Sequence, residues 1–119
     1  MTVSSPPDGV GVLRISELTR SVKTLLEEAY PQGVWVTGEV SNLSRPSSGH
    51  LYLKLKDAES QLNTVVYRGV ALRLRCDLRD GLEVIVRGRL GVYVPRGEYQ
   101  LLAEEVQPKG LGADRKSVV

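Results

Sequence analysis

The chain has 119 residues and a formal net charge of +2, which fits a single domain with one hydrophobic core. Its only cysteine is Cys76 and its only histidine is His50. An internal disulfide and a metal site built from several such side chains are therefore excluded, and the sequence indicates no cofactor. A single cysteine fits a reducing, cytoplasmic setting. No stretch has the character of a membrane span or a secretion signal, so no membrane contact is expected.

The positive charge is concentrated in one segment. Residues 45–75 hold six basic and two acidic side chains, a net of +4, whereas residues 1–44 carry −2 and residues 76–119 balance. Because local potential steers an anionic ligand more than total charge does, the middle of the chain is where such a ligand is expected.

A helix near the N-terminus precedes the rest of the fold. Residues 1–11, rich in Ser, Pro and Gly, predict a flexible N-terminus. A helix is predicted over residues 16–30, with Ser16 as its N-cap and Glu17 in its first turn. Its apolar residues recur at helical spacing and predict a stripe that packs on the barrel or on a partner: Leu18, Val22, Leu25, Leu26 and Ala29.

From Val34 onward the apolar residues alternate with period two, which is typical of strands. The segment Pro95–Gly97 predicts the last hairpin, and a short helical turn is expected at residues 70–74 within a long connection. Gly38, Gly88 and Gly91 lie inside strands, where glycines mark bulges or bends. The predicted strands are 34–43, 50–57, 61–68, 82–94 and 98–107.

Five bent strands with the widest connection after the third match the five-stranded antiparallel oligonucleotide/oligosaccharide-binding (OB) barrel. We therefore predict a mainly β fold, an OB barrel with an added N-terminal α-helix, over residues 12–110. The competing architecture is an open β-sandwich, for which five strands are too few.

The segment Arg45–Asp57 carries the clearest functional pattern. A loop rich in Pro, Ser and Gly leads into an alternating strand with leucines on one side. The other side presents Tyr52, Lys54 and Lys56, a ring that can stack a base and cations that can hold phosphate. An ordinary solvated strand face is the plainer interpretation of the same residues.

Several motifs in order resemble one family, the N-terminal OB domain of the bacterial exodeoxyribonuclease VII large subunit. The resemblance covers about residues 12–110 and rests on Tyr93 and on the runs Ile15–Thr19, Val34–Asn42, Arg45–Tyr52, Leu55–Asp57, Asp80–Val84, Val86–Arg89 and Pro95–Leu101. It implies that the parent protein is an exonuclease that degrades single-stranded DNA from both ends, with several copies of a small subunit bound to a missing part of the chain. It also implies that this domain binds the DNA and is not itself catalytic.

The resemblance further implies a longer chain, so we expect this one to be truncated. Residues 111–119 are expected to be a truncated or artefactual tail. The run Asp114–Val119 can be back-translated into a common sequencing adapter, which predicts read-through. An ordinary polar tail is the alternative.

Candidate binding residues lie on the predicted second and third strands and in the flanking loops. Asn63 carries an amide that can read a base edge, and in the related anticodon-binding barrels of aminoacyl-tRNA synthetases a Gln takes this place. Tyr93, Tyr99 and Trp35 are expected to pack, with Trp35 against the leading helix. The predicted nucleic-acid-binding set is Arg45, His50, Tyr52, Lys54, Lys56, Asn63, Tyr67, Arg68 and Arg96.

Two other functions fit the same sequence. One is an RNA-binding, anticodon-type OB domain, since stacking and phosphate contacts do not sense the 2′-hydroxyl. The other is a subunit-assembly module, in which the barrel and leading helix dock a partner or a second copy. Self-association of the isolated domain is a further expectation, because severed domains expose strand edges.

Overall fold

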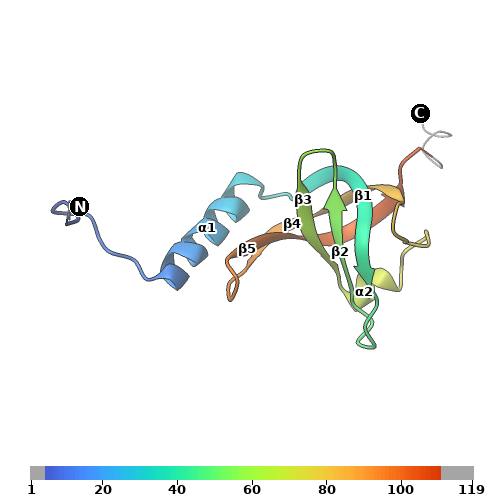
Figure 1. Cartoon of the computed structure of the whole chain (residues 1–119), viewed down its shortest axis with the longest axis horizontal. Helices are drawn as coiled ribbons and strands as arrows, with labels where there is room; N and C mark the ends of the chain where they lie inside the picture. The colour runs from blue at the N-terminus through green and yellow to red at the C-terminus, as the bar shows by residue number, and fades with distance from the viewer. Residues whose placement is uncertain (1–4, 111–119) are drawn as a thin grey trace.

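The computed structural model describes residues 5–110, which form a closed five-stranded barrel preceded by a helix (Figure 1). The predicted tail 111–119 lies outside the described residues. The elements in chain order are α1 (Ile15–Ala29), β1 (Val34–Ser44), β2 (Leu51–Lys56), β3 (Gln61–Val66), α2 (Arg68–Ala71), β4 (Glu83–Tyr93) and β5 (Glu98–Pro108).

The strands close in the order β1-β2-β3-β5-β4, which confirms the predicted OB barrel. Four of the neighbouring pairs are antiparallel. The pairing of β3 with β5 is parallel, with Asn63 opposite Gln100 and Val65 opposite Leu102. This pairing between distant segments closes the sheet, and it brings the middle of β3 beside the start of β5.

The core lies inside the barrel and follows the alternation of the strands. Leu51, Leu53 and Leu55 of β2 all point inward and are buried, as their period-two spacing predicts. The largest fully buried side chains come from four different strands: Val40, Val66, Val84, Val86 and Leu101. The core therefore connects β1, β3, β4 and β5, and leaves the outer face of the barrel free for other roles.

Two glycines allow backbones to approach closely where the barrel bends. A Cβ atom on Gly88 would lie 2.5 Å from the carbonyl oxygen of Leu102, at the point where the register between β4 and β5 shifts. Gly33 has a φ of +84° before β1, and a Cβ there would lie 2.5 Å from the carbonyl oxygen of Gly88. The bulge predicted at Gly88 is thus present, and side chains are excluded from both positions.

The helix α1 begins one residue earlier than its sequence predicts. Its N-cap is Arg14 rather than Ser16, because the Glu17 carboxylate accepts a hydrogen bond of 2.7 Å from the Arg14 backbone N–H. The carboxylate therefore satisfies the backbone at the helix start without help from a serine. Among the described residues, no helix is both long and apolar enough to cross a bilayer.

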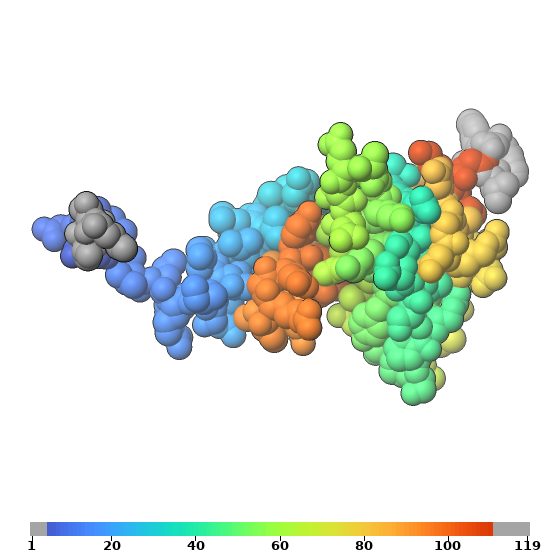
Figure 2. Space-filling view, in the orientation of Figure 1, coloured from blue at the N-terminus to red at the C-terminus, as the bar shows by residue number. Residues whose placement is uncertain are grey.

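The helix packs on the β4–β5 hairpin and leaves much of its apolar surface open. A hollow of about 380 Å³ separates Leu18, Val22 and Leu26 from Val92 and Tyr99. In the space-filling view the helix lies against the orange hairpin (Figure 2). No side chain of α1 is fully buried.

Trp35 lies on the outer face of β1, where its side chain is 59% exposed, and its cross-strand partner is Arg87 of β4. The hydrogen-bonding register turns this side chain away from the core, and its packing against the leading helix stays a prediction. The strand that α1 mainly contacts is β4.

The long connection between β3 and β4 closes one end of the barrel. Its short helix α2 confirms the helical turn expected in this segment. Leu78, which follows it, inserts into the core and is 3% exposed. Asp80 accepts a hydrogen bond from the Leu43 backbone N–H (3.0 Å). Cys76 is half-buried, and burial raises the pKa of its thiol.

Candidate nucleic-acid interface

The outer face of β2 presents the residues that the sequence singled out. Tyr52 is 42% exposed, and Lys54 and Lys56 follow it on the same face. Across the strand pair, Lys54 lies opposite Asn63 of β3, and Tyr52 lies opposite Val65. The pleat thus brings the predicted stacking ring, one cation and the predicted base-reading amide to one surface.

The burial of Val65 distinguishes this surface from an ordinary solvent-exposed strand face. Its side chain is on the outer side of β3 and yet only 7% exposed, and it lies outside the main core cluster. Tyr52 on β2 and Leu102 on β5 are its register partners. Val65 therefore provides an apolar floor beside the Tyr52 ring.

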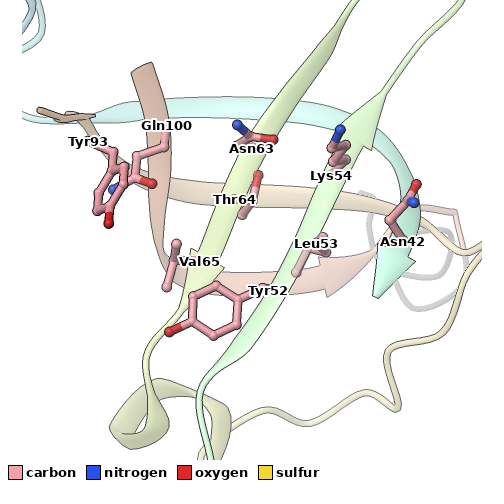
Figure 3. A pocket seen from close by; sticks show the side chains of 9 residues that line it. All are labelled: Asn42, Tyr52, Leu53, Lys54, Asn63, Thr64, Val65, Tyr93 and Gln100. Atoms are coloured by element: carbon pink, nitrogen blue, oxygen red, sulfur yellow. The ribbon is translucent and has the colours of Figure 1, made fainter. Parts of the chain in front are cut away.

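An open groove of about 420 Å³ runs over this floor (Figure 3). It combines two tyrosine rings, three side-chain amides and one lysine, which suits a nucleobase and its phosphate. Its lining residues are Asn42, Tyr52, Leu53, Lys54, Asn63, Thr64, Val65, Tyr93 and Gln100.

Six of the nine lining residues were missing from the predicted site, and three of these six lie outside β2 and β3. Tyr93 comes from the end of β4, Gln100 from β5 and Asn42 from the end of β1. Gln100 enters because it pairs with Asn63 across the parallel strands. Tyr93 has Glu98 as its cross-strand partner and Tyr99 has Val92, so the two tyrosines point to opposite faces of the hairpin.

Asn42 has a backbone conformation that is uncommon for residues other than glycine. Its φ is +54°, within a stretch where the register between β1 and β2 shifts. The Ser41 hydroxyl donates a hydrogen bond of 2.7 Å to its Oδ1 atom. An asparagine inside a strand pattern is the signal that could have revealed this bend, since asparagine tolerates the left-handed region better than most residues.

A hydrogen bond fixes the orientation of the Asn63 amide. Its Nδ2 atom donates to the Oε1 atom of Glu98 at 3.2 Å, joining β3 to the first residue of β5. In Figure 3 the Asn63 oxygen points toward the Lys54 side of the groove. Glu98 was not predicted to belong to the site.

A cluster of rings continues the surface beyond Tyr52. His50 meets Tyr67 edge-on at 5.4 Å between ring centroids, and meets Tyr52 at 6.4 Å. The Arg68 backbone N–H donates a hydrogen bond to Nδ1 of His50 at 2.9 Å, so Nδ1 acts as an acceptor here. The side chain of Arg68 lies over Gly49, so three predicted residues surround His50.

The other predicted residues lie outside this groove. The Arg45 guanidinium donates to the Leu78 carbonyl and lies 3.8 Å from Asp77, within a different hollow. Lys56 lines a separate hollow of about 230 Å³ with Tyr99. Arg96 is exposed in the turn between β4 and β5.

Four of the predicted binding cations differ from Arg87 of β4 in their ion pairing. Arg87 pairs with Glu104 (2.6 Å) and Glu105 (3.3 Å), and its hydrogen bond to Glu105 raises the pKa of its guanidinium further. Within residues 5–110, none of the ion pairs includes Lys54, Lys56, Arg68 or Arg96. These four side chains remain free to meet an anionic ligand.

In the described part of the chain, no three His, Cys, Asp or Glu side chains converge as a metal site would require. The groove instead offers rings, amides and ammonium groups. Such groups bind by stacking, hydrogen bonding and charge, and none of them is paired as a nucleophile with a base.

Comparison with known proteins shows the family to which the chain belongs. The chain is 51% identical over 104 residues to an exodeoxyribonuclease 7 large subunit from Pseudomonas aeruginosa, which is 87% of this chain and 22% of that protein. It is 48% identical over 110 residues to the corresponding protein of Rhodopirellula baltica, which is 92% of this chain and 24% of that protein. These relatives confirm the resemblance drawn from the motifs, and the chain spans less than a quarter of their length.

Two solved structures share the fold at low sequence identity. One is a chain of a replication protein A heterotrimer bound to ssDNA, with a TM-score of 0.50, 17% identity, and coverage of 62% of this chain and 54% of that one. The other comes from the S. pombe Stn1–Ten1 complex, with a TM-score of 0.53, 19% identity, and coverage of 67% and 60%. A family model described as an OB-fold nucleic acid binding domain matches residues 13–107, and the chain belongs to that family.

Proposed function

We propose that this domain binds single-stranded DNA across β2, β3 and β5. The observation that carries the proposal is the groove itself, in which Tyr52 and Tyr93 flank side-chain amides and Lys54 above an apolar floor. Bases stack on aromatic rings with little regard to sequence, and lysines hold the backbone between them. The predicted residues outside the groove, Arg45, Lys56 and Arg96, belong to the proposal as contacts along the path of the strand.

The relatives extend the proposal to the parent protein. Because they are named as large subunits of exodeoxyribonuclease 7, we infer that the domain presents single-stranded DNA to a nuclease region elsewhere in a longer chain. Exonuclease action from both ends, association with small subunits through that region, and a cytoplasmic location belong to the same proposal.

Fluorescence anisotropy with labelled oligonucleotides tests the proposal directly. The 119-residue chain is titrated with single-stranded DNA, duplex DNA and single-stranded RNA over a series of salt concentrations. We expect the tightest binding to single-stranded DNA, and weakening with salt as counterions are released from the phosphates. Equal or tighter binding of RNA would favour the anticodon-type alternative, and no binding at low salt would contradict the proposal.

A pair of tyrosine variants locates the site. Tyr52→Ala should lower the affinity by about 1–3 kcal/mol, the value of one stacked base. Tyr30→Ala is the matched control, because Tyr30 is similarly exposed (49% against 42%) but lies at the end of α1. A folded Tyr52→Ala variant with unchanged affinity would remove this residue from the site.

A role in assembly is the second candidate, and the exposed apolar face of α1 favours it. Leu25 is 60% exposed and Ile15 is 79% exposed. If this face mediates self-association, sedimentation equilibrium should show oligomers of the wild-type chain and a monomer for the Leu25→Glu variant. A monomer at all concentrations would contradict self-association and leave DNA binding unaffected.

A further inference from the structure

The groove holds one amide whose orientation is fixed by a carboxylate. The Nδ2 atom of Asn63 donates to the Oε1 atom of Glu98 at 3.2 Å. An ionised carboxylate can only accept hydrogen bonds, so it selects the amide orientation that directs nitrogen toward Glu98. The opposite atom, Oδ1, is left facing the groove on the Lys54 side (Figure 3).

The surrounding strands hold Glu98 in position for this role. Glu98 is the first residue of β5, and its cross-strand partner is Tyr93 of β4, which also lines the groove. Two residues further along β5, Gln100 lies directly beside Asn63. Glu98 therefore belongs to the same face of the sheet as the groove, although an acidic side chain is unfavourable to a phosphate backbone.

We propose that Asn63 acts as a hydrogen-bond acceptor of fixed orientation, which favours bases that carry an exocyclic amino group. Glu98 is the positioning residue that keeps the Asn63 amide in this orientation. The inference rests on the proposed binding of single-stranded DNA in this groove. It adds a moderate base preference to a surface that otherwise binds by stacking and charge.

Cytosine and uracil show why an acceptor of fixed orientation distinguishes between bases. Cytosine presents an N4 amino group at the edge where uracil presents the O4 carbonyl oxygen. The Asn63 oxygen can accept from the amino group, whereas it would face a second acceptor in uracil. The two rings have nearly the same size, so stacking on Tyr52 and Tyr93 differs little between them. The gain from one net hydrogen bond corresponds to a preference of roughly three- to tenfold.

The experiment compares oligodeoxycytidine with oligodeoxyuridine of about twelve nucleotides, a length that fits one OB domain. Binding is measured by anisotropy at low salt and mildly alkaline pH, where cytosine N3 is unprotonated. The wild-type chain, Asn63→Ala, Glu98→Gln and Glu28→Gln are compared. Glu28→Gln removes one negative charge from α1, so it matches the charge change of Glu98→Gln away from the groove.

Glu98→Gln is expected to raise affinity and lower selectivity together. Loss of the negative charge should tighten binding of both oligonucleotides by a factor of roughly two to five. Because a glutamine can donate as well as accept, the Asn63 amide becomes free to turn over, and the preference for cytidine should fall roughly threefold or more. Asn63→Ala should lose the same preference without the gain in affinity, and Glu28→Gln should keep it. A purely structural role of Glu98 would leave the ratio of the two affinities unchanged.

The outcomes separate the inference from the function on which it rests. Binding of both oligonucleotides without a preference, or a preference that survives in Glu98→Gln and Asn63→Ala, overturns the inference and leaves single-stranded DNA binding intact. No binding of either oligonucleotide overturns the proposed function and the inference with it.

Discussion

The Arg45 guanidinium donates a hydrogen bond to the main-chain carbonyl of Leu78, whose side chain is buried in the barrel core. This contact ties the loop after β1 to the connection that closes the barrel after α2. Leu43, two residues earlier, is tied to the same connection through Asp80. The end of β1 is therefore held by the segment that carries Leu78 into the core.

Arg45→Ala should destabilise the fold. Loss of a hydrogen bond to the Leu78 carbonyl should lower the free energy of unfolding by about 1 kcal/mol. Chemical denaturation measures this change, with Arg96→Ala as the control, because the Arg96 side chain is exposed in a hairpin turn. A loss of DNA affinity with unchanged stability would instead assign Arg45 to the interface alone.

Gly88→Ala should destabilise the barrel more than Gly91→Ala. A Cβ atom on Gly88 would lie 2.5 Å from the Leu102 carbonyl oxygen, whereas one on Gly91 would lie 3.7 Å from the nearest Leu102 atom. The first distance forces the strands apart and should cost about 1–3 kcal/mol. The second is an ordinary contact, for which a change within about 0.5 kcal/mol is expected. Equal thermal midpoints for the two variants would show that the bulge yields without strain.

Local patterns predicted the architecture well, because alternation and helical spacing are direct consequences of burial. Leu51, Leu53 and Leu55 alternate and are buried, and the OB barrel follows from such strands. The helix start was misplaced at Ser16, because a serine is the commoner cap. The Glu17 carboxylate caps the Arg14 backbone instead.

The site was predicted only in part, because it depends on pairings between distant segments. Tyr52 and Lys54 share one strand, so their common face could be read from the sequence. Gln100 enters the groove through the parallel pairing of β3 with β5, which no local pattern shows. The hydrogen bond from Arg45 to the Leu78 carbonyl also depends on the position of the long connection between β3 and β4, which no local pattern shows. The sequence placed Arg45 in the predicted binding set by its position in the loop before β2.

Asp57 should make stability depend on pH in the acid range. Its carboxylate accepts hydrogen bonds of 2.9 Å from the backbone N–H groups of Glu59 and Ser60, which lower its pKa in the folded chain. A lowered pKa means that the charged form stabilises the fold. This stabilisation is complete above the pKa of an unfolded aspartate, about 3.9, and is lost as the pH falls through the lower folded value.

The variant Asp57→Asn isolates this contribution, because its amide oxygen can still accept both hydrogen bonds and does not titrate. The difference in unfolding free energy between wild type and Asp57→Asn should be constant near neutral pH. As the pH falls below about 3.9, the wild type should lose unfolding free energy relative to Asp57→Asn. Parallel curves through the acid range would show that the turn does not favour the ionised carboxylate.

Lys54 and Tyr52 should affect DNA binding in different ways. Lys54 takes part in none of the ion pairs of the described chain and lines the groove, so its ammonium group is free to replace a counterion on a phosphate. Lys54→Ala should reduce the slope of the logarithm of affinity against the logarithm of salt by about 0.7, the value for one phosphate on a single strand. Tyr52→Ala should lower the affinity at every salt concentration and keep the slope, because stacking releases no counterion. Anisotropy titrations of both variants over the same salt series measure the two effects. An unchanged slope in Lys54→Ala would place the DNA backbone elsewhere, with Arg68 as the next residue to substitute.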